Sequence, residues 1–252
     1  MDNKERLTKV GNDILKNLLL TYDDFQIRFF LLILNKAISM HYAKAKDDNK
    51  FIDNTDFSGS CIQEIRTDFI RKYGAKKMDL GVCLEDNKEN KKTIMGVMQD
   101  LRSVCFRFEE NDNVITEIPV LSRVSYYKDR KSFIVTINSE ISKYLILISE
   151  NYSILDLNIT KDLRGKYEFG IYFIYSMYNT LKQGYKHYTI EEIGKFIGYE
   201  RKENSRTSDM IKYIEKAIVK INSKIEGTNK KKIKLEKETI GKKIVGVKFI
   251  FT

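Results

Sequence analysis

The chain has 252 residues, of which 42% are hydrophobic and 32% are charged, and its formal net charge is +10. This composition is typical of a globular protein, and the excess of lysine and arginine favours a polyanionic partner. Cys61, Cys83 and Cys105 are too few and too widely spaced for a disulfide framework or a CxxC metal site. No apolar run approaches the roughly 18–20 residues that span a bilayer, and the charged amino terminus has no signal-peptide pattern, so we expect a cytoplasmic protein without a membrane partner.

Helical periodicity dominates the first hundred residues. Apolar spacing predicts helices over residues 7–20, 23–40, 61–73 and 93–104, and the second of these is apolar enough on most sides to lie in the core. The pattern then changes to runs rich in Val, Ile, Phe and Tyr. These runs predict a three-stranded antiparallel meander over residues 104–110, 114–126 and 131–137. Helices followed by a β-ribbon favour a winged-helix domain.

The same order returns in the rest of the chain. We expect helices over residues 139–149, 162–183 and 208–224, a helix followed by a turn over residues 189–199, and a lysine-rich hairpin that ends the chain. Ser139 is the expected N-cap of the first of these helices, and Thr189 with Glu192 three residues later has the pattern of a capping box. The sequence therefore predicts an α+β protein of two tandem winged-helix domains, residues 1–150 and residues 151–252.

The positive charge is concentrated in the second predicted domain. Residues 1–150 hold 24 Lys and Arg against 23 Asp and Glu, a net of +1. Residues 151–252 hold 21 against 12, a net of +9. We therefore expect the second domain to contact the polyanion more than the first.

The last predicted helix has one apolar face and one polar face. On a helical wheel the apolar face consists of Met210, Ile211, Ile214, Ala217, Ile218, Ile221 and Ile225. In helix-turn-helix proteins, residues at the start of the second helix contact base edges, and Arg, Ser, Thr and Lys are suited to base or phosphate contacts. The DNA-binding candidates here are Lys202, Ser205, Arg206, Thr207, Ser208, Lys212, Lys216 and Lys220.

The lysine-rich hairpin adds a second group of candidates. Nine lysines and three glutamates lie between Lys220 and Lys243. We expect a wing with Lys230, Lys231 and Lys232 at its tip or on its first strand, and with Lys242 and Lys243 at the start of the return strand. If six of these cations each neutralise a phosphate, log K falls against log salt with a slope of about −5. Alternatively, the lysines protect an exposed edge strand from pairing with other chains.

Several weak motifs in a fixed order resemble the initiator Rep proteins of theta-replicating plasmids. The motif residues are Leu163, Arg164, Gly165, Lys166, Tyr167, Tyr172 and Ile174 in the long helix, Phe196, Ile197 and Gly198 in the turn, and Ala217, Ile218, Ile221 and Asn222 in the last helix. The resemblance covers most of residues 90–252. It implies two tandem winged-helix domains that bind direct repeats (iterons) in double-stranded DNA at a plasmid origin.

The resemblance also implies partners. Monomers of such proteins bind iterons, help to melt the adjacent AT-rich DNA and recruit host replication proteins, whereas dimers bind an inverted repeat and repress their own gene. The first domain is then expected to supply the dimer interface. Its helix around residues 91–102 could also contact DNA, through Lys91, Lys92, Thr93, Gln99 and Arg102.

The sequence lacks the catalytic motifs of the enzymes that we considered as alternatives. A rolling-circle initiator needs a metal-binding histidine pair beside a tyrosine nucleophile, but His41 and His187 are far apart in the sequence. The sequence has neither a GxxxxGK[ST] phosphate loop nor a GxSxG nucleophile elbow. We therefore expect no enzyme, no cofactor and no metal. A winged-helix transcriptional regulator without a replication role, or an assembly protein that does not bind DNA, stays open.

Overall fold

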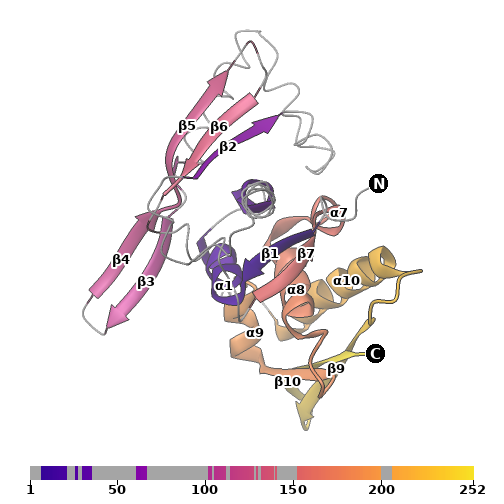
Figure 1. Cartoon of the computed structure of the whole chain (residues 1–252). Coiled ribbons are helices and arrows are strands. Elements are labelled where there is room, and N and C mark those ends of the chain that lie inside the picture. Colours follow the sequence, from indigo (N-terminus) through magenta and orange to yellow (C-terminus); the bar gives the residue numbers. More distant parts are fainter. Residues whose placement is uncertain are drawn as a thin grey trace. The chain divides into compact units, whose positions relative to one another are not determined.

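The computed structural model divides into two compact units that the chain crosses more than once (Figure 1). Unit 1 comprises Met1–Asn17 and Phe25–Asp162, and unit 2 comprises Leu18–Asp24 and Leu163–Thr252. The structure describes residues 7–21, 26–27, 30–35, 61–66, 102–103, 105–111, 114–127, 129, 132–138, 140, 152–199 and 206–252. The sequence-based division into residues 1–150 for dimerisation and residues 151–252 for DNA binding stays a prediction.

Unit 1 begins with a strand where the sequence predicts a helix. β1 (Leu7–Gly11) precedes α1 (Asn12–Thr21) and pairs antiparallel with β7 (Tyr152–Asp156), which is followed by the short helix α7 (Leu157–Thr160). The helical prediction for residues 7–11 is therefore wrong. Its apolar spacing, Leu7 and Val10, fits one turn of helix, but a partner strand about 145 residues later decides the conformation.

Helical residues at 26–27 and 30–35 agree with the predicted core helix over residues 23–40. Ile27 and the run from Phe30 to Leu34 are buried, and the side-chain amide of Asn35 donates to the carbonyl oxygen of Leu7 at 2.8 Å. The other residues of this predicted helix lie outside the described residues.

Two further sheets complete the described part of unit 1. Their strands are β2 (Cys61–Arg66), β3 (Cys105–Asn111), β4 (Val114–Pro119), β5 (Leu121–Tyr127) and β6 (Ser132–Ile137). One sheet has the order β2-β6-β5 and the other is the β3-β4 hairpin. The helix predicted over residues 61–73 is wrong for β2, which pairs with β6 about 70 residues later; residues 67–73 lie outside the described residues.

The predicted three-stranded meander is also wrong in detail. The run over residues 114–126 forms two strands, because β4 ends at Pro119 and the buried Val120 separates it from β5. A proline has no N–H group with which to continue a hydrogen-bonded ladder. Glu140 is helical and its N–H donates to the side chain of Asn138, but Ser139, the predicted N-cap, lies outside the described residues.

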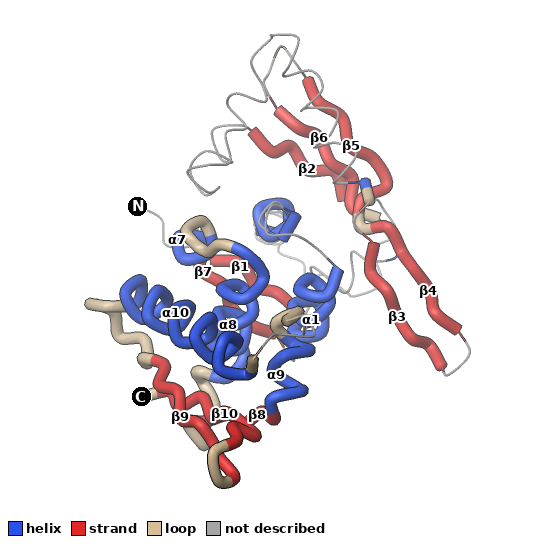
Figure 2. Tube along the Cα trace, turned by 180° about the vertical axis from the view of Figure 1, so that it is seen from behind, coloured by secondary structure: helices blue, strands red, loops and turns tan. Residues whose placement is uncertain are grey.

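Unit 2 has the element order of a winged helix. Its elements are α8 (Gly165–Tyr178), β8 (Tyr185–Thr189), α9 (Ile190–Phe196), α10 (Thr207–Ile225), β9 (Ile233–Ile240) and β10 (Lys243–Phe251). The three strands form an antiparallel sheet in the order β8-β10-β9, and α10 packs against α8 (Figure 2). The helix and turn predicted over residues 189–199 and the helix predicted over residues 208–224 are confirmed. The prediction over 162–183 is too long at both ends, and β8 was not predicted.

The core of unit 2 forms around α8. Every residue from Phe169 to Met177 is buried, so this helix is apolar on nearly all sides. Gly170 makes the close approach of α8 to the turn after α9 possible, since a Cβ there would lie 2.8 Å from the Cγ2 atom of Ile197. Through these contacts α8 supports the two helices that follow it in the chain. No helix in the described part of the chain is long and apolar enough to cross a membrane.

Candidate nucleic-acid interface

α9 is defined at both ends by local hydrogen bonds. The Thr189 N–H donates to Glu192 Oε2 at 2.8 Å and the Glu192 N–H donates to Thr189 Oγ1 at 3.2 Å, which confirms the capping box. Hydrogen bonds from the backbone and the hydroxyl of Thr189 hold the pKa of Glu192 below its usual value. At the other end, Gly198 has φ +65° and the Tyr199 N–H donates to Gly194 O at 2.8 Å, a Schellman motif.

α10 buries the face that the helical wheel predicts. All seven residues of the predicted apolar face are buried. Arg206, Ser208, Lys212 and Lys216 are exposed on the other side, and Thr207 is half-buried. Arg206 takes the N-cap position without a side-chain capping bond. The structure therefore brings these candidates to one end and one side of a single helix, whereas Lys202 and Ser205 lie outside the described residues.

α8 holds α10 along one edge. Lys220 Nζ lies 2.5 Å from Glu168 Oε2, and the ring of Tyr213 stacks on that of Tyr167 with centroids 5.3 Å apart. The Glu168 carboxylate also accepts a hydrogen bond from the Arg164 N–H at 2.5 Å. Lys220, one of the predicted DNA-binding residues, is thus already paired with a carboxylate of the protein.

β9 holds α10 along the opposite edge. Asn222 donates through Nδ2 to Ile233 O at 2.8 Å and accepts from the Ile233 N–H at 2.9 Å. Further along, Lys237 Nζ lies 2.8 Å from Glu215 Oε1. Because Ile233 precedes Lys237 while Asn222 follows Glu215, β9 runs antiparallel to α10. Asn222 belongs to the motif that resembles initiator proteins, but the sequence did not reveal this contact.

The hairpin lysines separate into two groups. Lys230, Lys231 and Lys232 lie in the α10–β9 connection rather than at the predicted tip or first strand, and the backbone of Lys232 pairs with Thr252 at the open end of the hairpin. Lys243 begins β10, as predicted, whereas Lys242 lies in the turn before it rather than on the return strand. An eight-residue strand is about 27 Å long, so the two groups lie at opposite ends of β9. The turn lies level with the amino-terminal end of α10, since β9 runs antiparallel to it.

His187 and Glu238 lie across the middle strand of the sheet. His187 Nε2 lies 2.8 Å from Glu238 Oε2, and both side chains pass over Gly246 of β10. A Cβ at Gly246 would lie 2.8 Å from His187 Nε2 and 3.1 Å from Glu238 Oε2. The side chain of His187 therefore joins the two outer strands of the sheet, β8 and β9, across β10.

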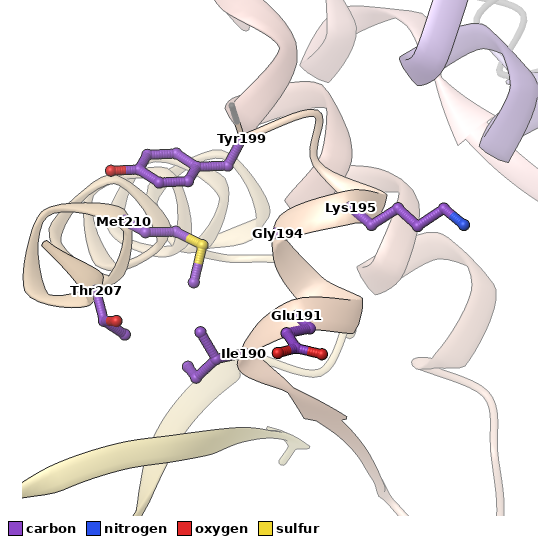
Figure 3. A pocket seen from close by; sticks show the side chains of 7 residues that line it. All are labelled: Ile190, Glu191, Gly194, Lys195, Tyr199, Thr207 and Met210. Carbon is purple, nitrogen blue, oxygen red and sulfur yellow. The ribbon is translucent and has the colours of Figure 1, made fainter. Parts of the chain in front are cut away.

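A cavity of about 290 Å³ lies between α9 and the start of α10 (Figure 3). Its lining consists of Ile190, Glu191, Gly194, Lys195, Tyr199, Thr207 and Met210. The lining holds one carboxylate, that of Glu191, and no cysteine or histidine. Across the described residues as a whole, no three His, Cys, Asp or Glu side chains gather where they could hold a metal ion.

Of the DNA-binding residues predicted in unit 1, the structure describes one. Arg102 is helical and exposed. Lys91, Lys92, Thr93 and Gln99 lie outside the described residues, as does most of the helix predicted over residues 93–104.

Comparison with known proteins identifies the family. Residues 8–176 match the family model described as "Initiator Replication protein, WH1". The chain belongs to this family of initiator replication proteins. The match covers more than half of the chain and ends within α8, so the hairpin and α10 lie beyond it. The resemblance stated from the sequence motifs is confirmed.

Among solved structures 22 chains match, and one of them extends the likeness to nearly the whole chain. A crystal structure of Pi initiator protein in complex with iteron DNA aligns over 99% of this chain and 98% of that chain, with a TM-score of 0.65 and 14% identity. This likeness confirms the fold of tandem winged helices. A structure of domains 2 and 3 of RctB aligns with a TM-score of 0.43 and 9% identity over 96% of this chain and 82% of that chain. Among curated proteins, none matches the sequence.

Proposed function

We propose that this initiator replication protein binds repeated sites in double-stranded DNA at the origin of a plasmid. One observation carries the proposal: in unit 2 the exposed side of α10 lies beside a hairpin, and Arg206, Lys212 and Lys216 on the helix accompany Lys242 and Lys243 on the hairpin. A helix that fits the major groove, next to a ribbon with cations for the neighbouring phosphates, is the arrangement of winged-helix DNA-binding domains. The Pi initiator protein, which shares the fold, was crystallised with iteron DNA.

The residues of α10 and of the hairpin contact DNA in two ways, through base edges and through phosphates. Arg206 and Ser208 at the start of α10 contact base edges, while Lys212 and Lys216 contact phosphates further along the helix. The hairpin turn lies level with the start of α10, so Lys242 and Lys243 contact phosphates that flank the same bases. Lys220 contributes to the orientation of α10 through Glu168 rather than to DNA binding.

DNA binding is followed by three further steps. The protein opens the AT-rich DNA beside the repeats and recruits host replication proteins, and as a dimer it represses its own gene through an inverted repeat. Residues 1–150, with a net charge of only +1, supply the dimer interface. Sedimentation of the full chain over a range of concentrations tests this step: a reversible monomer–dimer equilibrium is expected, and a strict monomer at high concentration contradicts it.

A gel shift and a footprint on the DNA that flanks the gene test the proposal. An initiator protects several equally spaced direct repeats next to an AT-rich tract. Protection of a single palindrome at a promoter would instead identify a transcriptional regulator. Protection of neither would identify an assembly protein and would overturn the proposal.

A further inference from the structure

One side of α10 faces solvent along nearly its whole length. Ser208, Lys212, Lys216, Val219 and Ser223 are all exposed, and we name these five residues the open stripe. At about 100° per residue they fall within roughly 80° of arc on the helix, opposite the buried face. The open stripe is therefore a single surface that runs along the helix.

The contacts at both edges fix which way the open stripe faces. On one edge Tyr213 stacks on Tyr167 of α8, and on the other Glu215 pairs with Lys237 of β9. α10 cannot rotate about its axis without breaking one of these contacts. Any duplex that α10 meets beside the hairpin thus meets the open stripe.

Val219 differs from the other members of the open stripe. It is the apolar member, and 70% of its surface is exposed. Valine is a poorer helix former than alanine, lysine or glutamate, because its branched side chain loses rotamer freedom on a helix. Neither helix propensity nor burial in the core therefore accounts for valine at this position.

We propose that Val219 contacts the 5-methyl group of a thymine in the major groove and makes α10 selective for thymine at that position. This inference rests on the proposed function, since it requires α10 to lie in the groove. Thymine is the base that presents an apolar group on the major-groove edge, where A, G and C present hydrogen-bonding groups. A branched aliphatic side chain is complementary to that methyl group and forms no hydrogen bond with the other three bases.

The position of Val219 along α10 determines how far the thymine lies from the base at the start of the helix. Val219 follows Ser208 by eleven residues, which is about 16 Å along an α-helix. Bases on one strand are about 3.4 Å apart along the duplex axis. Because the groove is inclined to the duplex axis, α10 lying lengthwise in it advances by less than this length along the axis, so the thymine lies at most about five base pairs from the base that the start of the helix contacts.

The test exchanges thymine for deoxyuridine, which lacks the methyl group and keeps every hydrogen-bonding group. On the repeat found by footprinting, each thymine is replaced singly, and dissociation constants are measured for the wild type and for Val219→Ala. With the wild type we expect a loss of about fourfold at one thymine, the effect of exposing one methyl-sized group. With Val219→Ala the same replacement is expected to have no effect.

A matched control separates this coupling from a general loss of affinity. Ile115→Ala truncates another exposed aliphatic side chain, in β4, and is expected to keep the full fourfold loss at that thymine. Thermal unfolding of Val219→Ala should match that of the wild type, because an exposed side chain is shortened. Val219→Thr, which keeps one branch methyl, is expected to retain part of the coupling.

The outcomes distinguish the two proposals. If the protein protects spaced repeats but no thymine shows coupling to Val219, the inference is overturned and the proposed function stands. If it protects no repeats, both are overturned. A coupled thymine within about five base pairs of the base coupled to Arg206 or Ser208 supports both.

Discussion

Asn222 in the last turn of α10 is hydrogen-bonded to both backbone groups of Ile233, the first residue of β9, at 2.8 and 2.9 Å. The side-chain amide thus occupies the place of a neighbouring strand at the edge of the sheet. Since the hairpin begins there, these two bonds set where the wing starts relative to α10. The Lys237–Glu215 pair then keeps β9 alongside the helix.

Replacing Asn222 should therefore loosen the wing. Asn222→Ala leaves the N–H and the carbonyl oxygen of the buried Ile233 without their partner, and we expect it to lower the free energy of unfolding by about 1–3 kcal/mol in urea titrations. Asn222→Asp should cost at least as much, because a carboxylate cannot donate to Ile233 O. Ser223→Ala serves as the control, since the Ser223 hydroxyl donates within the helix to Lys220 O. Equal stability of all four proteins would contradict the role of Asn222.

The lysines of α10 should differ in their effect on salt dependence. Lys212 and Lys216 are exposed on the open stripe, so the double replacement by glutamine should flatten the slope of log K against log salt by about 1.8 units. Lys220→Gln should leave the slope nearly unchanged and lower the free energy of unfolding by about 1 kcal/mol, because Lys220 is paired with Glu168. Lys182→Gln, an exposed change in the loop between α8 and β8, controls for net charge. A slope that changes by the same amount per lysine in all these variants would indicate a non-specific electrostatic field rather than a contact surface.

The lysines at the two ends of the hairpin should also differ in their effect on salt dependence. Lys242→Gln with Lys243→Gln should flatten the salt slope by about 2 units, because the turn lies level with the base-contacting end of α10. For the three lysines at the open end, the sequence predicts a change of about 2–3 units. Lys232 is already paired with Glu226 at 3.3 Å, so we expect a smaller change per lysine there. An unchanged slope for both sets would favour the alternative in which the lysines protect a strand edge.

Local signals explain what could be predicted from the sequence. The capping box at Thr189, the glycine at position 198 and the apolar periodicity of α10 each act within about four residues, so α9 and α10 were predicted closely. The sequence predicts helices at β1 and β2 because the partner strands lie about 145 and 70 residues away, and no local pattern encodes such pairing. The position of Lys230 in the α10–β9 connection cannot be predicted without knowing where β9 begins and how it pairs with β10. The helical wheel predicts the buried face of α10, but only the structure shows that Val219 on the other side is 70% exposed.

Gly246 should be intolerant of any side chain. Gly246→Ala places a Cβ 2.8 Å from His187 Nε2 and 3.1 Å from the carbonyl oxygen of Tyr188, so we expect a loss of about 1–3 kcal/mol in the free energy of unfolding. Removing the imidazole creates space for the methyl group. The double variant with His187→Ala should therefore lose less than the sum of the two single variants. Strict additivity in the urea titrations would show that the contact over Gly246 does not determine the cost.

The capping box should make the stability of α9 depend on pH. Hydrogen bonds from Thr189 hold the pKa of Glu192 below its usual value of 4.5, so the ionised carboxylate is favoured in the folded state. A lowered folded-state pKa contributes stability above the unfolded-state pKa, and this contribution is lost as the pH falls through the folded-state pKa. The difference in unfolding free energy between the wild type and Glu192→Gln should thus be constant near neutral pH and shrink below about pH 4.5. Glu191→Gln removes a carboxylate from the same helical turn that makes no capping bond, and a shrinkage of equal size in this control would assign the effect to the helix dipole instead of the capping box.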